Sequence, residues 1–253
     1  MKKYNIYPYR TDLKLKEENV IGDNQIKIIE NIISNKIYKT IIFNDNITKD
    51  KIKDILTKEL IFFYKKMHAL IYKNFLIIGI GNDNYTSDSI GPKTLKSIKV
   101  NYLLDNMKKP SIKVSAIEPG ALGETGILTE KIISSITKEI KPDIIILIDS
   151  YITDNINYLN KSIEINNRGL YSGCGISNIN SQLDEEQIGV PIIAIGVPTA
   201  IEVKFTNNNK TNFKPYLLST KDVDKYINII SKVIGESINS SINYLLQYQG
   251  NND

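Results

Sequence analysis

The stretch FLIIGIGNDNYTSDSIGPKTL, residues 75–95, decides the fold of this chain. Its first four residues are apolar and run into Gly79, a pattern typical of a buried strand that ends at a glycine. A polar loop follows. Pro92 then marks the start of a helix, because proline suits the first helical turn. We predict a strand over 75–79 and a helix over 92–104.

The alternation of strand and helix signals continues along the chain. The further predicted strands are 111–117, 143–148, 162–165 and 192–197, and the further predicted helices are 50–68, 129–140 and 221–246. Apolar strands separated by helices predict an α/β three-layer sandwich with a mostly parallel central sheet, covered on both faces. Residues 26–43 fit one helix or two strands equally well on pattern alone. No repeat or linker divides the chain, so a single domain over 1–253 is expected.

Composition excludes several functional classes. Of the 253 residues, 42% are apolar and 24% are charged, which is ordinary for a globular protein. A single cysteine (Cys174) excludes a disulfide framework, and a single histidine (His68) excludes any site that needs two imidazoles from one chain. The net charge of +4 is too small for a dedicated nucleic-acid binder. With no secretory signal and no apolar run of about 18 residues, we expect a cytoplasmic protein that binds neither membrane nor nucleic acid directly.

The loop at 79–92 does not match the dinucleotide-binding fingerprint. Gly79 and Gly81 fit the first two glycines of GxGxxG, but the third position is Asn84. The two glycines are therefore interpreted as allowing a tight turn after the strand, and no cofactor is expected.

Two aspartates are the candidate catalytic residues. Asp88 lies in the loop after the first strand, and Asp149 directly follows the apolar run 144–148. Taken alone, Asp88 would be interpreted as a helix cap. Because the carboxyl ends of parallel strands meet at one edge of a sheet, the two carboxylates can approach each other there. Such a pair divides into one acid and one base, which could activate water for amide hydrolysis, or it could hold a metal.

A second glycine-rich loop, 118–126, is placed at the same edge by this topology, and a third, 169–178, is similarly rich in glycine. Backbone N–H groups in such loops can bind a substrate chain or an oxyanion. The candidate substrate-binding residues are Gly81, Asn82, Gly120, Gly123, Gly173 and Gly175. A tight turn with solvated glutamates is the plainer interpretation of 118–126. Cys174 would need His68 as its base, and because His68 lies on an early predicted helix, Cys174 is interpreted as a packing residue.

Several collinear segments together resemble the germination (spore) protease family. They are YRTDLKLKEE (9–18), GIGNDNYTSDSIGPKTL (79–95), VSAIEPGALGETGILT (114–129), KPDIIILIDS (141–150), IGVPIIAIGVPTAIE (188–202) and the C-terminal STKDVDKYINIISKVIGESINSSINY. The resemblance implies an aspartic-type endopeptidase that degrades small acid-soluble spore proteins during spore germination. It also implies a homotetramer in the spore core or forespore, with Asp88 and Asp149 matching the proposed catalytic pair.

The resemblance also sharpens the fold prediction. The family is related to the hydrogenase-maturation proteases, of phosphorylase/hydrolase-like fold, and it has an N-terminal β hairpin, which favours two strands over 26–43. Family members are made as zymogens, and since little precedes Arg10, a removable pro-segment here is expected to be only a few residues long. The chain departs from the family pattern at Tyr171, Ser172 and Cys174, where the family usually has histidine, proline and serine.

Two other functions compete with this hypothesis. A metal-dependent maturation peptidase would use Asp88 and Asp149 as ligands, but it needs a third ligand. A catalytically silent relative would bind spore proteins without cleaving them. Which aspartate is the acid and which the base is left open by the residues.

Assembly is predicted partly from the N-terminal region. Two short isoleucine-rich strands are only marginally stable alone, so a neighbouring subunit is expected to cover the isoleucines at 26, 28, 41 and 42. Packing of the same isoleucines on the helix at 50–68 is the competing expectation.

Overall fold

The structure is a computed structural model, which describes residues 19–101, 112–153, 155–172, 181–203 and 216–251. Its helices are α1 Lys49–Lys66, α2 Ile90–Leu95, α3 Leu122–Thr125, α4 Thr129–Ile140, α5 Glu185–Ile188 and α6 Val223–Gly250, with 3-10 turns η1 Ala69–Ile71 and η2 Thr86–Asp88. Its strands are β1 Asn19–Asp23, β2 Ile26–Ile33, β3 Lys36–Phe43, β4 Asn74–Gly79, β5 Lys113–Ile117, β6 Ile144–Thr153, β7 Ser162–Asn166, β8 Gly169–Ser172, β9 Ser181–Asp184, β10 Ile192–Val203 and β11 Tyr216–Leu218.

Nine of these strands form one mixed sheet, in the order β1-β2-β3-β7-β10-β6-β4-β5, with β11 paired to β10. The strands β10, β6, β4 and β5 pair in parallel, whereas β1, β2, β3 and β7 continue the sheet in antiparallel pairs. The predicted largely parallel centre is confirmed, and this is the half of the sheet that carries both candidate aspartates. Strands β8 and β9, which were not predicted as a pair, form a separate two-stranded sheet.

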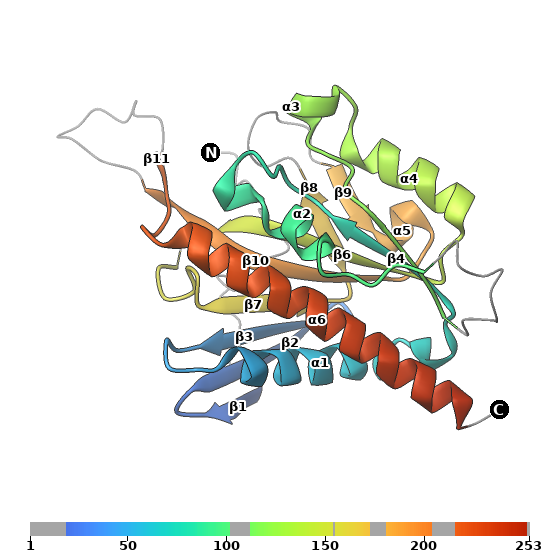
Figure 1. The fold of residues 1–253 in the computed structure, drawn as a ribbon, viewed down its shortest axis with the longest axis horizontal. Helices are drawn as coiled ribbons and strands as arrows, with labels where there is room; N and C mark the ends of the chain where they lie inside the picture. The colour runs from blue at the N-terminus through green and yellow to red at the C-terminus, as the bar shows by residue number, and fades with distance from the viewer. Residues whose placement is uncertain (1–18, 102–111, 154, 173–180, 204–215, 252–253) are drawn as a thin grey trace.

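The two faces of the large sheet are covered by different elements, because alternate residues of each strand point to opposite faces. Phe75 and Ile77 of β4 pack with apolar side chains of α1 and α6. Their neighbours Leu76 and Ile78 pack on the other face, with Ile133 of α4 and with residues of β8 and β9. Figure 1 shows α6, in red, running across the molecule beside α1, with which it makes extensive contact. The predicted three-layer α/β arrangement is therefore confirmed.

The N-terminal hairpin is also confirmed. Residues 26–43 form β2 and β3, which pair antiparallel around Ser34 and Asn35. Both turn residues have positive φ (49° and 62°), the backbone conformation of a type I′ hairpin turn. The strand β1 was not predicted, and it extends the hairpin to three strands.

The helix predicted over 92–104 is wrong in its length, since α2 ends at Leu95. The backbone N–H of Asn101 donates to the carbonyl of Val114 (2.9 Å), and the Asn101 side chain accepts from the Val114 N–H (2.7 Å). These bonds to β5 replace the helical ones. Residues 102–104 lie outside the described residues.

The end of the strand predicted over 143–148 also needs correction. Strand β6 continues to Thr153, so Asp149 lies within the strand and not after it. The strand continues because β10 pairs with it through Ile201, far beyond the last residue paired to β4. Among the described helices, none is both long and apolar enough to span a membrane.

Candidate active site

Asp88 is held by a loop that folds back tightly on the end of β4. The backbone N–H of Asn82 donates to the Asp88 carbonyl at 3.0 Å. Gly81 has a φ of 125°, and a Cβ built on it would lie 2.0 Å from the same carbonyl oxygen. Any side chain at position 81 would therefore push Asp88 away. Gly81, a predicted substrate-binding residue, has a structural reason to be glycine.

A second close contact joins this loop to the sheet. A Cβ built on Gly79 would lie 2.4 Å from the carbonyl oxygen of Gly91, and a Cβ on Gly91 would lie 2.2 Å from that of Ile80. Backbone thus meets backbone where α2 crosses the end of β4. The helix–strand packing that a dinucleotide fold obtains from its third glycine, absent here at Asn84, is obtained from Gly91.

Asp149 lies at the point where β6 loses β4 as a neighbour but remains paired with β10. Strand β4 pairs with β6 only as far as Gly79 opposite Ile148, so Asp149 is the first β6 residue beyond that partner. On the other side β10 continues, with Gly196 opposite Asp149. The Asp149 carboxylate therefore sits beside a shortened strand and opposite a residue without a side chain.

Ser150 links Asp88 and Asp149, because it donates a hydrogen bond to each of them. The Ser150 hydroxyl donates to Asp88 Oδ1 at 3.1 Å, and the Ser150 backbone N–H donates to Asp149 Oδ1 at 2.8 Å. Nothing in the sequence pattern indicated Ser150, because its role depends on where the 79–92 loop folds.

Burial is the largest cause that raises the pKa of both carboxyl groups. Burial raises the pKa of Asp88, as does the negative charge of Glu124, while hydrogen bonds from Ser150 and the Asn82 backbone lower it in part. Burial together with the charge on Asp88 raises the pKa of Asp149 well above its ordinary value. The two carboxyl groups therefore titrate as a pair, and the proton is held more strongly on Asp149.

A β-bulge in β10 also holds the 79–92 loop in place, through Thr199. The pairing of β10 with β6 shifts register between Pro198 and Ala200, which leaves Thr199 as the extra residue. The Thr199 hydroxyl donates to the carbonyl of Ser87, the residue before Asp88. Thr199 is buried, and apart from the preceding proline no local pattern indicates this contact.

The 118–126 loop reaches the same edge, as predicted. The Asn84 side chain donates to Glu124 Oε1 at 3.2 Å, and the other Glu124 oxygen accepts from the Ala121 N–H. Gly120 has a φ of 73°, so its turn favours glycine, whereas a Cβ on Gly123 would meet nothing within 4 Å.

Other predicted residues fall in different places. Asn82 is buried, and its side-chain oxygen accepts from the Asn84 N–H at 2.8 Å, which stabilises the loop. Gly173, Gly175 and Cys174 lie outside the described residues.

The residues do not fit a carboxylate–carboxylate–histidine metal site. His68 is exposed, and it precedes β4, whereas Asp88 follows that strand. The length of β4 therefore separates the histidine from the aspartates. In the described part of the chain, no three His, Cys, Asp or Glu side chains converge as metal ligands.

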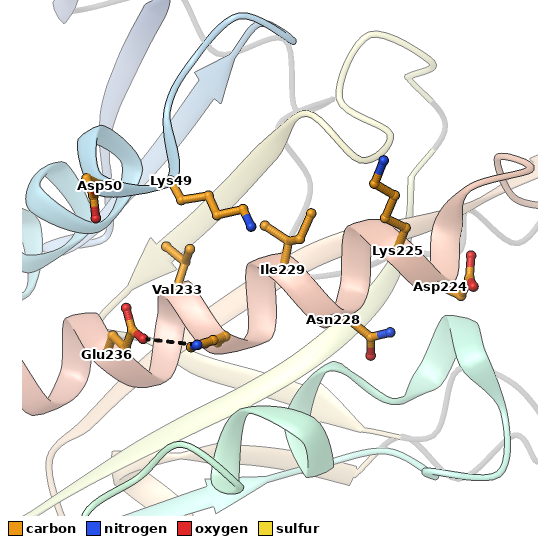
Figure 2. A pocket seen from close by; sticks show the side chains of 9 residues that line it. Lys49, Asp50, Asp224, Lys225, Asn228, Ile229, Val233 and Glu236 are labelled. Carbon is orange, nitrogen blue, oxygen red and sulfur yellow. Dashed lines mark ion pairs between the residues drawn. The ribbon is translucent and has the colours of Figure 1, made fainter.

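A polar pocket of about 460 Å³ lies away from the aspartates, between the start of α1 and α6 (Figure 2). Its lining mixes lysines with carboxylates, including Lys49, Asp224 and Glu236. Glu236 also forms an ion pair with Lys232 at 3.9 Å. Surface charges of this kind are ordinary, and the pocket contains neither candidate aspartate.

Comparison with known proteins identifies the family. A sequence model described as germination protease matches residues 37–218. A germination protease of Clostridium tetani is 30% identical over 284 aligned positions, which cover 94% of this chain and 87% of the relative. Those of a Geobacillus species and of Priestia megaterium are 34% and 32% identical, over 65% and 67% of this chain.

The matched region spans only about half of these last two relatives, 46% and 47% of their lengths. Among solved structures, a [NiFe] hydrogenase maturation protease from Thermococcus kodakarensis aligns with 66% of this chain and 94% of its own, at 18% identity and a TM-score of 0.38. The family model alone covers well over half of the described fold, including both aspartates and the loops around them. The chain belongs to the germination protease family, a family of endopeptidases.

Proposed function

We propose that this chain is an endopeptidase that hydrolyses small acid-soluble spore proteins during spore germination, with Asp88 and Asp149 as its catalytic pair. One observation carries the proposal: two carboxyl groups from separate segments each accept a hydrogen bond from Ser150, and the charge of one acts on the other. Membership of a protease family supports the reaction class.

The two aspartates are assigned different roles. Asp88 accepts hydrogen bonds that stabilise its ionised form, so we assign it as the general base. Asp149 holds a proton more strongly because it is buried beside the Asp88 charge, so we assign it as the general acid. With Asp88 as the base and Asp149 as the acid, the reaction does not need a histidine, and His68 lies on the other side of β4 in the sequence.

The reaction then follows in two proton transfers. Asp88 takes a proton from water while the water oxygen attacks the carbonyl carbon of the peptide bond. Asp149 gives its proton to the amide nitrogen as the carbon–nitrogen bond breaks. Backbone N–H groups in the loop that contains Gly120 and Gly123 are proposed to bind the substrate chain or its oxyanion.

The spore-core location, the zymogen form and the homotetramer belong to the same proposal. The structure removes one argument for assembly, because Ile26 and Ile41 are buried within the chain, in the same cluster as Ile52 and Leu56 of α1. The competing expectation of intramolecular packing is thus confirmed for these two isoleucines. The tetramer now rests on family membership alone, and light scattering at micromolar concentration tests it.

Cleavage of a purified spore protein, followed by mass spectrometry of the products, tests the function. Asp88→Asn and Asp149→Asn should each lower kcat at least about a hundredfold, because each removes a group that transfers a proton. Circular dichroism should show that both variants remain folded.

Asp83→Asn is the matched control, since Asp83 lies in the same loop but is exposed and paired with Lys96 (2.6 Å). It should cleave at the wild-type rate. Wild-type activity in either variant of the pair would overturn the assignment. A wild-type protein that binds spore proteins without cleaving them would instead establish the silent relative.

A further inference from the structure

Ser150 contacts both candidate catalytic residues. Its backbone N–H donates to Asp149 Oδ1 (2.8 Å) and its hydroxyl donates to Asp88 Oδ1 (3.1 Å). One bond comes from the backbone and the other from the side chain, and both donors belong to β6. A single residue therefore links two groups that are distant in the sequence.

The sheet fixes the backbone of Ser150. It lies inside β6 and pairs with Val197 of β10, while β4 has already ended opposite Ile148. The Ser150 side chain reaches Asp88, while the Asp149 carboxyl group turns back to accept from the Ser150 backbone N–H. The Ser150 hydroxyl therefore reaches the 79–92 loop from a backbone that is paired with β10.

We propose that Ser150 is a positioning residue that sets the geometry of the aspartate pair and keeps the exchangeable proton on Asp149. This inference rests on the proposed function, because it specifies how the pair is divided into base and acid.

Ser150 acts on both carboxyl groups: its backbone N–H lowers the pKa of Asp149 in part, and its hydroxyl is the group that acts on Asp88. The hydroxyl of Ser150 lowers the pKa of Asp88, against the burial and the Glu124 charge that raise it. Glu124 comes from α3, and the Asp88 charge in turn raises the pKa of Asp149. A hydrogen bond to an ionised carboxylate is stronger than one between neutral groups, so the hydroxyl favours ionisation of Asp88 over Asp149.

Removing the hydroxyl tests the proposal through the pH dependence of cleavage. In Ser150→Ala the acid limb of kcat/KM should move to higher pH, because the pKa of Asp88 rises when a donor to its ionised form is lost. On that limb kcat should fall about tenfold, with KM unchanged. Ser150→Thr keeps the hydroxyl and suits a strand, so it should restore the wild-type profile.

Ser115→Ala is the control on β5, two strands away from β6, where the Ser115 hydroxyl donates to the Phe75 carbonyl at 3.3 Å. It should leave the profile unchanged. Titration of ¹³C-labelled aspartate carboxyl groups by NMR gives a readout that does not depend on activity, and it should show a higher midpoint for Asp88 in Ser150→Ala.

The outcomes separate this inference from the function on which it rests. An unchanged Asp88 midpoint and an unchanged profile in Ser150→Ala, with Asp88→Asn inactive, would overturn the role of Ser150 and leave the pair intact. Full activity of Asp88→Asn would overturn the proposed function, while the NMR titration would still decide whether Ser150 controls the Asp88 carboxyl group.

Discussion

The loops at 79–92 and 118–126 both follow parallel strands at the same edge of the sheet, and both are rich in glycine. In the first, Gly79, Gly81 and Gly91 lie against backbone atoms so closely that no side chain fits. In the second, a Cβ on Gly123 would meet nothing within 4 Å. The same residue type thus serves close packing in one loop and leaves open surface in the other.

This difference bears on how glycine-rich loops are interpreted. The glycines of the 79–92 loop let the chain turn back so that Asp88 reaches Ser150, and they are part of the scaffold. The open glycine of the 118–126 loop leaves space around its backbone, which the proposed substrate binding would require. Glycine content alone does not distinguish the two uses, whereas the space around each glycine does.

Gly91→Ala should have the largest effect. The added methyl group would lie 2.2 Å from the Ile80 carbonyl oxygen, and both partners are backbone that cannot rotate away. We expect a loss of about 3 kcal/mol or more in the free energy of unfolding, and cleavage activity should fall as Asp88 is displaced. Denaturant unfolding measures the loss. Stability equal to wild type would show that α2 can move away from β4 easily.

Thr199→Val should have the next largest effect on the first loop. It removes the donor to the Ser87 carbonyl and leaves a polar group unpaired, at about 1–3 kcal/mol. Activity should fall with it, because Ser87 precedes Asp88. Thr199→Ser keeps the hydroxyl and is the control for unfolding and cleavage assays. If valine and serine behaved alike, the bulge would not be holding the loop.

Asp88→Asn should change stability with pH in a defined direction. Because folding raises the pKa of Asp88, the carboxyl group stabilises the fold most while protonated, below the ordinary value of about 3.9. That contribution is lost as the pH rises through the folded pKa. Asparagine cannot ionise, so the variant should melt above wild type at neutral pH, and the difference should shrink in acid.

Thermal melts from pH 3 to pH 8 measure this effect, where 1 kcal/mol corresponds to about 2–4 °C. Glu124→Gln in the second loop is the comparison, since glutamine can still cap the short α3. Its melting temperature should stay near wild type at neutral pH. A lower melting temperature for Asp88→Asn at neutral pH would contradict the inferred direction.

Gly123→Ala should have the smallest effect, and it sharpens the comparison between the loops. Position 123 is open and lies within α3, so alanine should change the free energy of unfolding by no more than about 0.5 kcal/mol. Thermal melts beside Gly91→Ala provide the direct contrast. A raised KM with unchanged stability would support contact between this loop and the substrate. A large loss of stability would show that there is no free space for a side chain at position 123.

Much of the fold was predictable from local pattern. The helix α4 was predicted to the residue from its apolar spacing, and β4 was placed within one residue by its apolar run and terminal glycine. Both aspartates were found because they follow such runs. These signals are local, and tertiary contacts do not override them.

The features that the sequence did not reveal depend on distant contacts. The early end of α2 follows from hydrogen bonds between Asn101 and β5. The extension of β6 past Asp149 follows from pairing with β10. Ser150 and Thr199 are ordinary polar residues in strands, and only the folded loop gives them partners. Residues 26–43 were assigned through the family resemblance, because their pattern fitted helix and strand alike.

The position of β10 has a consequence for the order in which the protein matures. This strand is the last of the parallel strands to be synthesised, yet it lies between β6 and β7 in the sheet. A nascent chain that has emerged past Asp149 already contains both aspartates, but it lacks Gly196 opposite Asp149 and the hydroxyl of Thr199 on the loop. Since strands distant in sequence pair late, the proposed catalytic geometry should be complete only after residues 192–203 have left the ribosome.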